Sequence, residues 1–387
     1  MSQLSVLYLV HDLADAAVQK RVTMLDDGGA RVLVAGFRRC EEEIATVSAS
    51  RAMNLGQTHN GGFAQRCAAV IQQVLHAHKI KAQAESPNLI IARNLEMLAI
   101  AVKVRSLYPE SAQPIIVYES LDIHRLLLDM GVVGKLLRGL EGWLSKRCAL
   151  LITSSPAFIR EYFKEISQVE LPIKLIENKI YIPEIDNANV AQCTRPTPPP
   201  WKIGWFGAIR CNKSLALLSA LVQKNPGKIE VIIRGKPAYD QFDDFDAQIS
   251  RVEGLNFYGA YKNPDDLKEM YNAVHFSWCI DMFEEGQNSN WLLPNRLYEG
   301  GANCSVPIAQ AHVETGKVLE QLGIGVLLPH EQEAYLQQFF DRLDMPHYET
   351  LAEKSAQIPL SRWYYDQTFC KNLVQELSVL SNEAHHG

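Results

Sequence analysis

The sequence contains no uninterrupted apolar run of about 18 residues, the length that a membrane-spanning helix requires. Its first segment, MSQLSVLYLVHD, is apolar but lacks the basic start and the small-residue cleavage site of a signal peptide. We therefore expect this segment to form a buried strand and the protein to be cytoplasmic.

Cysteine is sparse and scattered. None of the eight cysteines lies in a CxxC pair, and they stand at positions 40, 67, 148, 193, 211, 279, 304 and 370. This spacing favours reduced thiols over a disulfide framework or a zinc site.

A strongly basic domain is also absent, because the formal net charge is -6 at pH 7. The sequence therefore gives no support to a nucleic-acid partner, because domains that bind nucleic acids usually carry concentrated positive charge. The contents of 47% hydrophobic and 21% charged residues are typical of a folded globular protein. At 387 residues the chain exceeds the usual size of one hydrophobic core, so two domains are expected.

Short apolar runs alternate with helix-period segments along the whole chain. In the first half we predict strands at 5–10, 31–37, 88–92, 114–118 and 150–153, and helices near 14–27, 63–81, 95–106 and 132–147. In the second half the predicted strands are 202–206, 229–233, 255–258, 275–280, 306–309 and 325–328, and the helices are 214–223, 264–272, 294–300, 314–321 and 364–380. This alternation predicts an α/β fold class with parallel sheets covered by helices on both faces.

The rhythm breaks at residues 181–200, where four prolines near the end of the segment favour extended chain. We predict an N-terminal Rossmann-like domain over 1–180, this linker, and a second Rossmann-like domain over 201–362. We predict a final helix over 363–387, which could cross back and pack on the N-terminal domain. Two doubly wound domains facing each other form a cleft, and such sheets bind ligands at the carboxyl ends of their strands.

The clearest motif is Ile203-Gly-Trp-Phe-Gly-Ala-Ile-Arg-Cys-Asn-Lys213. Gly207, after a buried strand, allows close backbone approach, and the next helix offers free N–H groups and its positive dipole end to phosphate. Arg210 and Lys213, placed in the connecting loop, could neutralise a diphosphate. An ordinary strand-to-helix turn with two solvated cations fits the same pattern.

Three further segments of the second half repeat this theme. The predicted strands 229–233 and 255–258 again end near a glycine with a polar side chain beside it. The third segment, Pro294-Asn-Arg-Leu-Tyr-Glu-Gly, begins a helix, and proline suits the first turn of a helix. A carboxylate one turn into such a helix can accept hydrogen bonds from both hydroxyls of a ribose. The candidate donor-site residues in these segments are Arg234, Tyr261, Asn295, Arg296 and Glu299.

Taken as a set, these segments resemble the C-terminal domain of glycosyltransferases with the GT-B fold, near the large retaining family four. The resemblance covers residues 200–330 well and the N-terminal half in layout. More narrowly, residues 295–301 and Glu314-Thr-Gly look like bacterial exopolysaccharide-assembly glycosyltransferases. The resemblance implies that Lys213 binds the donor diphosphate, that residues 255–279 cradle the base, and that Glu299 holds the ribose.

Two positions depart from the family's pattern. Arg210 stands three residues after Gly207, where the family has its arginine next to the glycine. Trp291 occupies the place of a second glutamate, while Glu284 and Glu285 lie nearby in a longer loop. Whether the enzyme retains or inverts the anomeric configuration of the transferred sugar is therefore left open.

The N-terminal half is expected to bind the acceptor. Asp122, followed by Glu119 and His124, lies just past a strand end and is our candidate for the group that removes a proton from the acceptor hydroxyl. In a retaining enzyme these residues would instead contact the sugar, and Asp122 could also simply cap a helix. The candidate acceptor contacts at other strand ends are His11, Asp12 and Arg93, although Asp12 fits a helix cap equally well.

The segment 132–147 is a distinctive helix candidate. Its apolar side carries Leu136, Leu137, Leu140, Trp143 and Leu144, while Lys135, Arg138, Lys146 and Arg147 lie mostly elsewhere. Such a helix could rest on an anionic membrane surface, making the protein peripheral on the inner membrane. A core-packed helix with a solvated basic face fits the pattern as well.

The leading hypothesis is a hexosyltransferase that moves a sugar from a nucleoside diphosphate sugar to a saccharide acceptor. The resemblance implies uridine as the base and a lipid-linked acceptor in exopolysaccharide assembly. No Asp-x-Asp element lies in the expected cleft loops, so we expect no metal and no other cofactor. The alternatives are a nucleotide-sugar epimerase that needs no acceptor, and an inactive partner subunit marked by Trp291.

Overall fold

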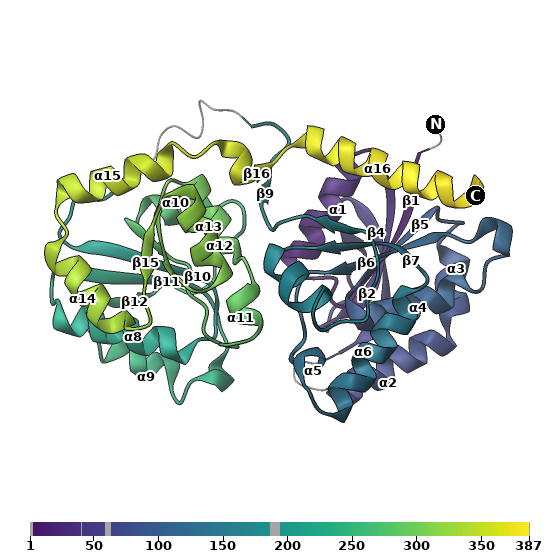
Figure 1. The fold of residues 1–387 in the computed structure, drawn as a ribbon, viewed down its shortest axis with the longest axis horizontal. Coiled ribbons are helices and arrows are strands. Elements are labelled where there is room, and N and C mark those ends of the chain that lie inside the picture. Colours follow the sequence, from purple (N-terminus) through teal and green to yellow (C-terminus); the bar gives the residue numbers. More distant parts are fainter. Residues whose placement is uncertain (1–2, 40, 59–62, 186–193, 387) are drawn as a thin grey trace. The chain divides into compact units, whose positions relative to one another are not determined.

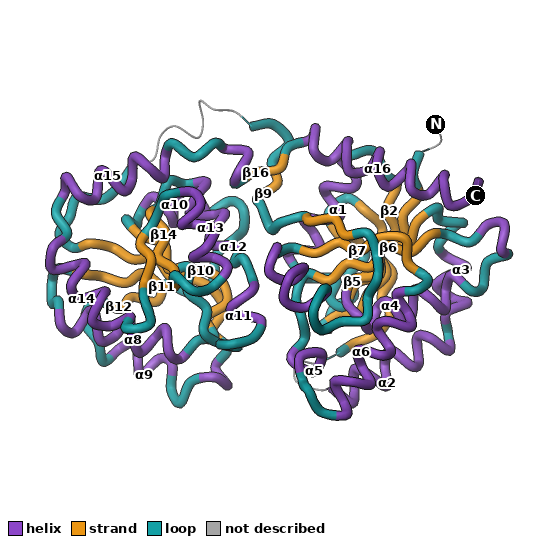
Figure 2. The backbone as a smooth tube through the Cα atoms, in the orientation of Figure 1, coloured by secondary structure: helices purple, strands orange, loops and turns teal. Residues whose placement is uncertain are grey.

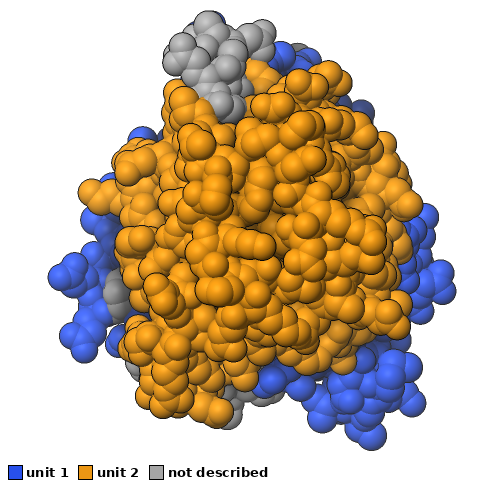
Figure 3. All heavy atoms as spheres, turned by 90° about the vertical axis from the view of Figure 1, so that its left-hand side faces the viewer, with its two compact units in different colours: residues 1–177, 181–184, 365–387 blue, residues 178–180, 185–364 orange. Residues whose placement is uncertain are grey.

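The structure is a computed structural model that describes residues 3–39, 41–58, 63–185 and 194–386. The chain forms two compact units, drawn in Figures 1 and 3. The first comprises residues 1–177, 181–184 and 365–387, and the second comprises residues 178–180 and 185–364. Residues 186–193 of the predicted linker lie outside the described residues.

The first unit is built on an eight-stranded sheet with the strand order β3-β4-β2-β1-β5-β6-β7-β8 (Figure 2). Neighbouring strands are parallel except for the β3–β4 pair, which is antiparallel. The strands are β1 (Ser5–Val10), β2 (Arg31–Arg38), β3 (Thr46–Val47), β4 (Ser50–Gln57), β5 (Leu89–Arg93), β6 (Ile115–Ser120), β7 (Cys148–Thr153) and β8 (Ile173–Leu175). Successive residues of β1 point to opposite faces, and both Leu7 and Tyr8 are fully buried, so helices must cover both faces.

Seven α-helices cover this sheet within the described residues. They are α1 (Ala16–Asp27), α2 (Phe63–Leu75), α3 (Ala77–Gln83), α4 (Asn94–Arg105), α5 (Arg125–Leu128), α6 (Val132–Ser145) and α16 (Gln367–His386). Helix α16 packs on α1 so closely that a Cβ on Gly28 would lie 2.5 Å from the Cys370 carbonyl oxygen. Leu373 and Leu377 of α16 belong to the same buried cluster as Tyr8, so the C-terminal helix is part of the core of the first unit.

The second unit is built on a six-stranded parallel sheet with the order β12-β11-β10-β13-β14-β15. Its strands are β10 (Trp201–Ile209), β11 (Ile229–Pro237), β12 (Leu255–Phe257), β13 (Phe276–Trp278), β14 (Val306–Gln310) and β15 (Val326–Leu328). Its helices are α8 (Asn212–Lys224), α9 (Phe245–Ser250), α10 (Leu267–Asn272), α11 (Asn288–Trp291), α12 (Asn295–Ala302), α13 (Glu314–Leu322), α14 (Gln332–Arg342) and α15 (Met345–Ala356). The short strands β9 (Ile180–Tyr181) and β16 (Tyr364–Tyr365) pair where the chain passes between the units.

Both faces of the second sheet are buried as well. On one face, Trp205 of β10 packs in a cluster with Leu218 of α8 and Phe340 of α14. On the other face, Phe206 packs with Tyr271 of α10. The predicted α/β class with parallel sheets covered on both faces is therefore confirmed.

The secondary structure differs from the sequence prediction at several places. The helix expected over 63–81 is two helices, α2 and α3, separated at His76. The connecting segment after β10 is shorter than expected, because β10 continues to Ile209 and α8 begins at Asn212. None of the helices in the described parts of the chain is both long and apolar enough to cross a membrane.

His275 is a fully buried imidazole in the core of the second unit. Its Nδ1 accepts a hydrogen bond from the Lys202 backbone N–H at 2.9 Å, and its Nε2 donates to the Pro196 carbonyl at 2.9 Å. A second ring proton would point at the Lys202 N–H, so this pair of contacts selects the neutral ring. Burial lowers the pKa of His275 from 6.5 to about 4.

This pKa predicts a specific acid sensitivity. Because the folded state binds the proton more weakly than the unfolded state, the stabilisation is complete above pH 6.5 and is lost as the pH falls toward 4. We expect His275 to account for a loss of about 3 kcal/mol of unfolding free energy over that interval. Urea unfolding at a series of pH values measures it, and a His275→Gln variant should lose less stability on acidification. Parallel pH dependence of the two proteins would contradict this prediction.

Candidate functional site

Three glycines leave the carboxyl edge of the second sheet bare of side chains. Gly207 and Gly235 face each other at the ends of β10 and β11, with φ angles of 104° and 144°. A Cβ on Gly235 would lie 1.9 Å from the Gly207 carbonyl oxygen, so only glycine fits there. Gly235 donates a backbone hydrogen bond of 2.8 Å to Gly259, which follows β12. A Cβ on Gly259 would meet nothing within 4 Å, and one on Gly207 only the Tyr261 hydroxyl at 3.9 Å, so a ligand can approach the backbone closely at these two glycines.

Arg210 lies between the end of β10 and the start of α8, and two residues of the segment after β13 hold it. Its guanidinium donates to a carboxylate oxygen of Asp281 at 2.9 Å and stacks over the ring of Phe283 at 4.8 Å. Burial would raise the pKa of Asp281, but Arg210 and Arg296 hold it below its usual value. Asp281 was not among the predicted site residues, although its position just after a predicted strand was available as a signal.

Lys213 lies in the first turn of α8, and not in a loop as the sequence analysis expected. Its ammonium forms an ion pair with Glu285, and its side chain is 65% exposed. Lys213 also lines an open pocket of about 450 Å³ together with Leu217, Met282 and His330. Because α8 is 13 residues long, its N-terminus adds a positive dipole end beside this cation.

Asp281 and Glu285 come from the same segment, which joins β13 to α11. The Ser289 hydroxyl donates to Asp281 at 3.3 Å and accepts from the Glu284 backbone N–H at 2.9 Å. Ser289 belongs to α11, so these two hydrogen bonds tie the segment to the start of that helix. Trp291, at the place of the glutamate that the family pattern expects, ends the short helix α11. The segment thus supplies a carboxylate partner to each of the two predicted phosphate-binding cations.

Helix α12 brings a second arginine to the glycine edge. Arg296 is buried and donates to the carbonyls of Ile280 at 2.9 Å and Phe206 at 3.4 Å. Phe206 lies in β10 and Ile280 lies two residues past the neighbouring strand β13, so Arg296 links these two parts of the chain. Asn295, the first residue of α12, is exposed.

Glu299 is buried below these groups on the same helix. Its two oxygens accept hydrogen bonds from the Asn263 amide at 2.9 Å and from the Tyr271 hydroxyl at 3.1 Å. Burial and the Glu299 charge raise the pKa of Tyr261, whose hydroxyl would lie 3.9 Å from a Cβ on Gly207. Arg234 lies at the end of β11 and forms a 3.8 Å ion pair with Asp266. The predicted donor-site residues therefore gather at one edge of one sheet.

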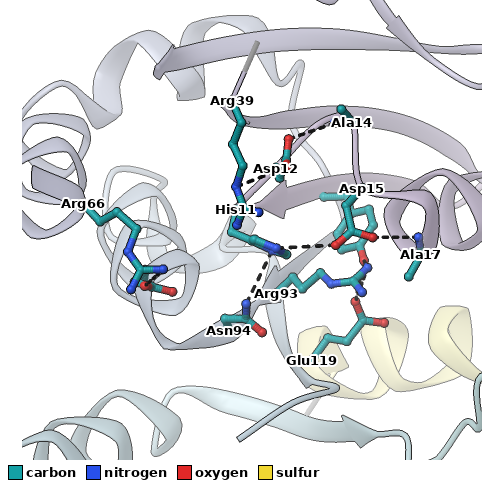
Figure 4. A network of polar contacts seen from close by, with 12 residues as sticks. His11, Asp12, Ala14, Asp15, Ala17, Arg39, Arg66, Arg93, Asn94 and Glu119 are labelled. Carbon is teal, nitrogen blue, oxygen red and sulfur yellow. Dashed lines mark hydrogen bonds and ion pairs between the residues drawn. The ribbon is translucent and has the colours of Figure 1, made fainter. Parts of the chain in front are cut away.

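Figure 4 shows a polar network of the first unit, which includes the buried carboxylate of Glu119. Arg21 donates to it at 2.8 Å, the Tyr8 hydroxyl also donates to it, and Arg93 lies 3.9 Å away. Burial alone would raise the pKa of Glu119, but Arg21 and Arg93 hold it below its usual value. With no exposed surface, this carboxylate is placed to hold the arginines rather than to meet an acceptor.

The predicted acceptor contacts lie around this network (Figure 4). His11, at the end of β1, lies 3.5 Å from Asp15 and 3.4 Å from the Asn94 amide. Burial and Arg93 lower the pKa of His11 to about 4. Asp12 accepts from the Ala14 N–H at 3.1 Å and pairs with Arg39 at 3.3 Å. Asp12 is not the helix cap, because the side chain of Asp15 caps α1.

The candidate base residues after β6 differ in exposure. Asp122 is exposed, and it is not the helix cap, because the Nδ1 of His124 accepts from the Leu126 N–H at the start of α5. The other ring nitrogen of His124 lies 3.5 Å from Arg66. Burial and the Arg66 charge lower the pKa of His124 from its usual value. Sequence reasoning missed Arg39 and Arg66, which come from segments with no distinctive pattern.

Solved structures identify the class of this fold. The chain superposes on sucrose-phosphate synthase from Thermosynechococcus elongatus with a TM-score of 0.74 and 11% identity, covering 98% of this chain and 100% of that one. It also resembles Anabaena HepE in complex with UDP and glucose, with a TM-score of 0.65 and 15% identity over 97% of this chain and 100% of the other. The fold is the GT-B fold of glycosyltransferases, as the sequence predicted.

The particular family follows from sequence. The chain is 45% identical over 386 residues to the succinoglycan biosynthesis protein ExoL of Rhizobium meliloti (strain 1021), covering 98% of this chain and 95% of the relative. The chain belongs to the ExoL family. No protein-family model matches the sequence. The predicted resemblance to exopolysaccharide-assembly glycosyltransferases is confirmed.

Proposed function

We propose that this protein transfers a sugar from a nucleoside diphosphate sugar, with uridine as the expected base, to a saccharide acceptor carried on a lipid. Membership of the ExoL family, whose named member is a succinoglycan biosynthesis protein, and the GT-B fold together support a glycosyltransferase of exopolysaccharide synthesis. The observation that carries the donor proposal is the gathering of Gly207, Arg210, the start of α8 and Glu299 at one sheet edge. The likeness to HepE, a protein solved with UDP and glucose, supports uridine.

The proposed chemistry at the donor site is electrostatic. As the bond between the sugar and the diphosphate breaks, negative charge develops on the leaving diphosphate. Arg210, Lys213 and the N-terminus of α8 would stabilise this charge, because all three are positive and follow Gly207 within six residues of the chain. These groups would do what a metal ion does in other transferases, so we propose that the reaction requires no metal.

Glu299 is the proposed ribose-binding residue. The Asn263 amide and the Tyr271 hydroxyl hold its carboxylate in one orientation. A carboxylate held in this way can accept from the two adjacent hydroxyls of a ribose without reorganising. Arg234 and Tyr261 are the proposed contacts beside it.

The first unit is proposed to bind the acceptor. Asp122 remains the first candidate for the base that takes the proton of the acceptor hydroxyl, because it is exposed at a strand end. His124 is the second candidate, because it is exposed near the same strand end. Glu119 would act through Arg93, whose position it fixes, and His11 and Asp12 would contact the acceptor.

Calorimetric titration with UDP, GDP and ADP, in buffer containing a chelator, tests the donor proposal. We expect binding of UDP at micromolar concentration, with weaker binding of the other two nucleotides. Addition of a chelator should leave the turnover of the sugar donor unchanged. Failure of all three nucleotides to bind would overturn the proposal. Product formation from the donor alone would indicate an epimerase, and binding without any turnover would indicate an inactive partner subunit.

A further inference from the structure

Helix α6 exposes most of its apolar residues, although Leu144 is buried. Val132, Leu136, Leu140 and Trp143 form a stripe along its outer side, because their spacing of three or four residues places them on one face. Leu136 is 68% exposed and Trp143 is 54% exposed. Met130, just ahead of the helix, and Val133, in its first turn, are exposed as well. We call this set of six residues the α6 stripe.

The inner side of α6 explains why the stripe faces outward. Arg138 is buried and donates to the carbonyls of Leu127 at 2.6 Å and Asp129 at 2.7 Å. Glu141 is fully buried and accepts from the hydroxyls of Tyr118 at 2.7 Å and Tyr162 at 2.6 Å. Rolling the helix to bury the stripe would break these four hydrogen bonds and expose partners that need them. The exposure of the stripe is therefore fixed by the fold.

Most charges around the stripe are positive, although the exposed Asp129, next to Met130, is acidic. Lys135 on α6 is exposed, and Lys146 follows the end of the helix on the same side. The Arg147 guanidinium lies over the Trp143 ring at 4.1 Å and donates to the Trp143 carbonyl. The residues that α6 exposes include no acidic side chain, because its glutamate is buried. An apolar stripe with a tryptophan and flanking cations matches an anionic lipid surface.

A second helix presents apolar residues nearby in the fold. Ile71 and Leu75, one turn apart on α2, are 61% and 72% exposed. Helices α2 and α6 both contact α4, so they cover the same side of the first sheet. An exposed apolar surface spread over two helices of one unit indicates a binding surface rather than isolated exposed residues.

We propose that the α6 stripe docks the first unit on the surface of an anionic phospholipid bilayer. The apolar side chains enter the interface between headgroups and acyl chains, while Lys135, Lys146 and Arg147 meet the phosphates. A lipid-linked acceptor would then be presented to the unit that is proposed to bind acceptor. The role of this docking in presenting an acceptor rests on the proposed function, but the binding of the stripe to a bilayer does not.

Co-sedimentation of the full chain with vesicles tests this proposal. We expect binding to vesicles that contain phosphatidylglycerol, weaker binding to pure phosphatidylcholine, and a loss of binding as salt is added. A Leu136→Ser/Leu140→Ser/Trp143→Ser variant should bind at least tenfold more weakly. A Val379→Ser variant, which alters an exposed apolar residue of α16, should bind like the wild type. Lys135→Gln/Lys146→Gln should reduce the preference for the anionic lipid.

Two outcomes would overturn the proposal. One is equal vesicle binding by the wild type and the triple variant. The other is sedimentation showing a wild-type dimer and a monomeric triple variant, because the stripe would then be a protein interface. Titration with UDP separates failure of the docking from failure of the proposed function, since the triple variant should bind UDP like the wild type.

Discussion

Replacing Glu299 with alanine is expected to weaken UDP binding at least about 100-fold. The proposed complex has two ribose hydroxyls donating to the Glu299 carboxylate. Hydrogen bonds to a charged group contribute about 1.5–3 kcal/mol each, and about 1.4 kcal/mol is a factor of ten in affinity. The variant also leaves the buried Tyr271 hydroxyl and the Asn263 amide without their acceptor, so the remaining pocket is less ordered.

Calorimetric titration of wild type and variant with UDP measures the effect. Glu320→Ala is a matched control, because Glu320 is an exposed glutamate of the neighbouring helix α13 in the same unit. Thermal unfolding of both variants shows whether the second unit remains folded. Glu299→Gln keeps one acceptor oxygen and should lose less affinity than Glu299→Ala. Wild-type affinity in a folded Glu299→Ala variant would exclude Glu299 from the nucleotide site.

Much of the fold could be predicted because it follows from local apolar patterns. Strand β1 has the bounds expected from its apolar run, since both of its faces are buried. Strand β4 was not predicted, because its residues Ser50–Gln57 are largely polar at an exposed position in the sheet. Helices α14 and α15 were missed although signals were present. Leu336 and Phe340 have helical spacing in α14, and Asp344 caps α15 two residues before Pro346.

The candidate site was less predictable, because burial and pairing are properties of the folded chain. Glu119 and Asp122 both follow the same apolar run, yet one is fully buried and the other is exposed. The ion pairs of Arg210 and Lys213 join residues far apart in the sequence. Helix α6 illustrates the same limit, since its pattern fitted both burial and exposure of the leucines. The hydrogen bonds of buried Arg138 and Glu141 decide between them.

The segment between β13 and α11 connects two departures from the family pattern. Arg210 stands further from the glycine than the pattern expects, and Asp281 and Phe283 of this segment hold it from the other side. Trp291 replaces an expected glutamate, while Glu285 of the same segment forms an ion pair with Lys213. Donor binding would bring a diphosphate into competition with these carboxylates. This arrangement gives each of the two cations a carboxylate partner when no donor is bound.

Removing either cation is therefore expected to reduce turnover more than nucleotide recognition. Loss of one group that stabilises a developing negative charge lowers kcat about 100- to 1000-fold. Arg210→Met and Lys213→Met should each show such a loss, measured by release of UDP in the presence of acceptor. Uridine, which has no phosphate, should bind both variants like the wild type, because its contacts lie near Glu299.

Lys224→Met is the matched control for this pair, because Lys224 is an exposed lysine at the other end of the same helix α8. It lies outside the proposed diphosphate site, so its kcat should equal that of the wild type. The double variant Arg210→Met/Lys213→Met distinguishes two arrangements of the charge. If both cations contact the diphosphate, the double variant should lose more activity than either single variant. If the double variant is no slower than the slower single variant, only one of the two stabilises the leaving group, and the other is held by its carboxylate throughout the reaction.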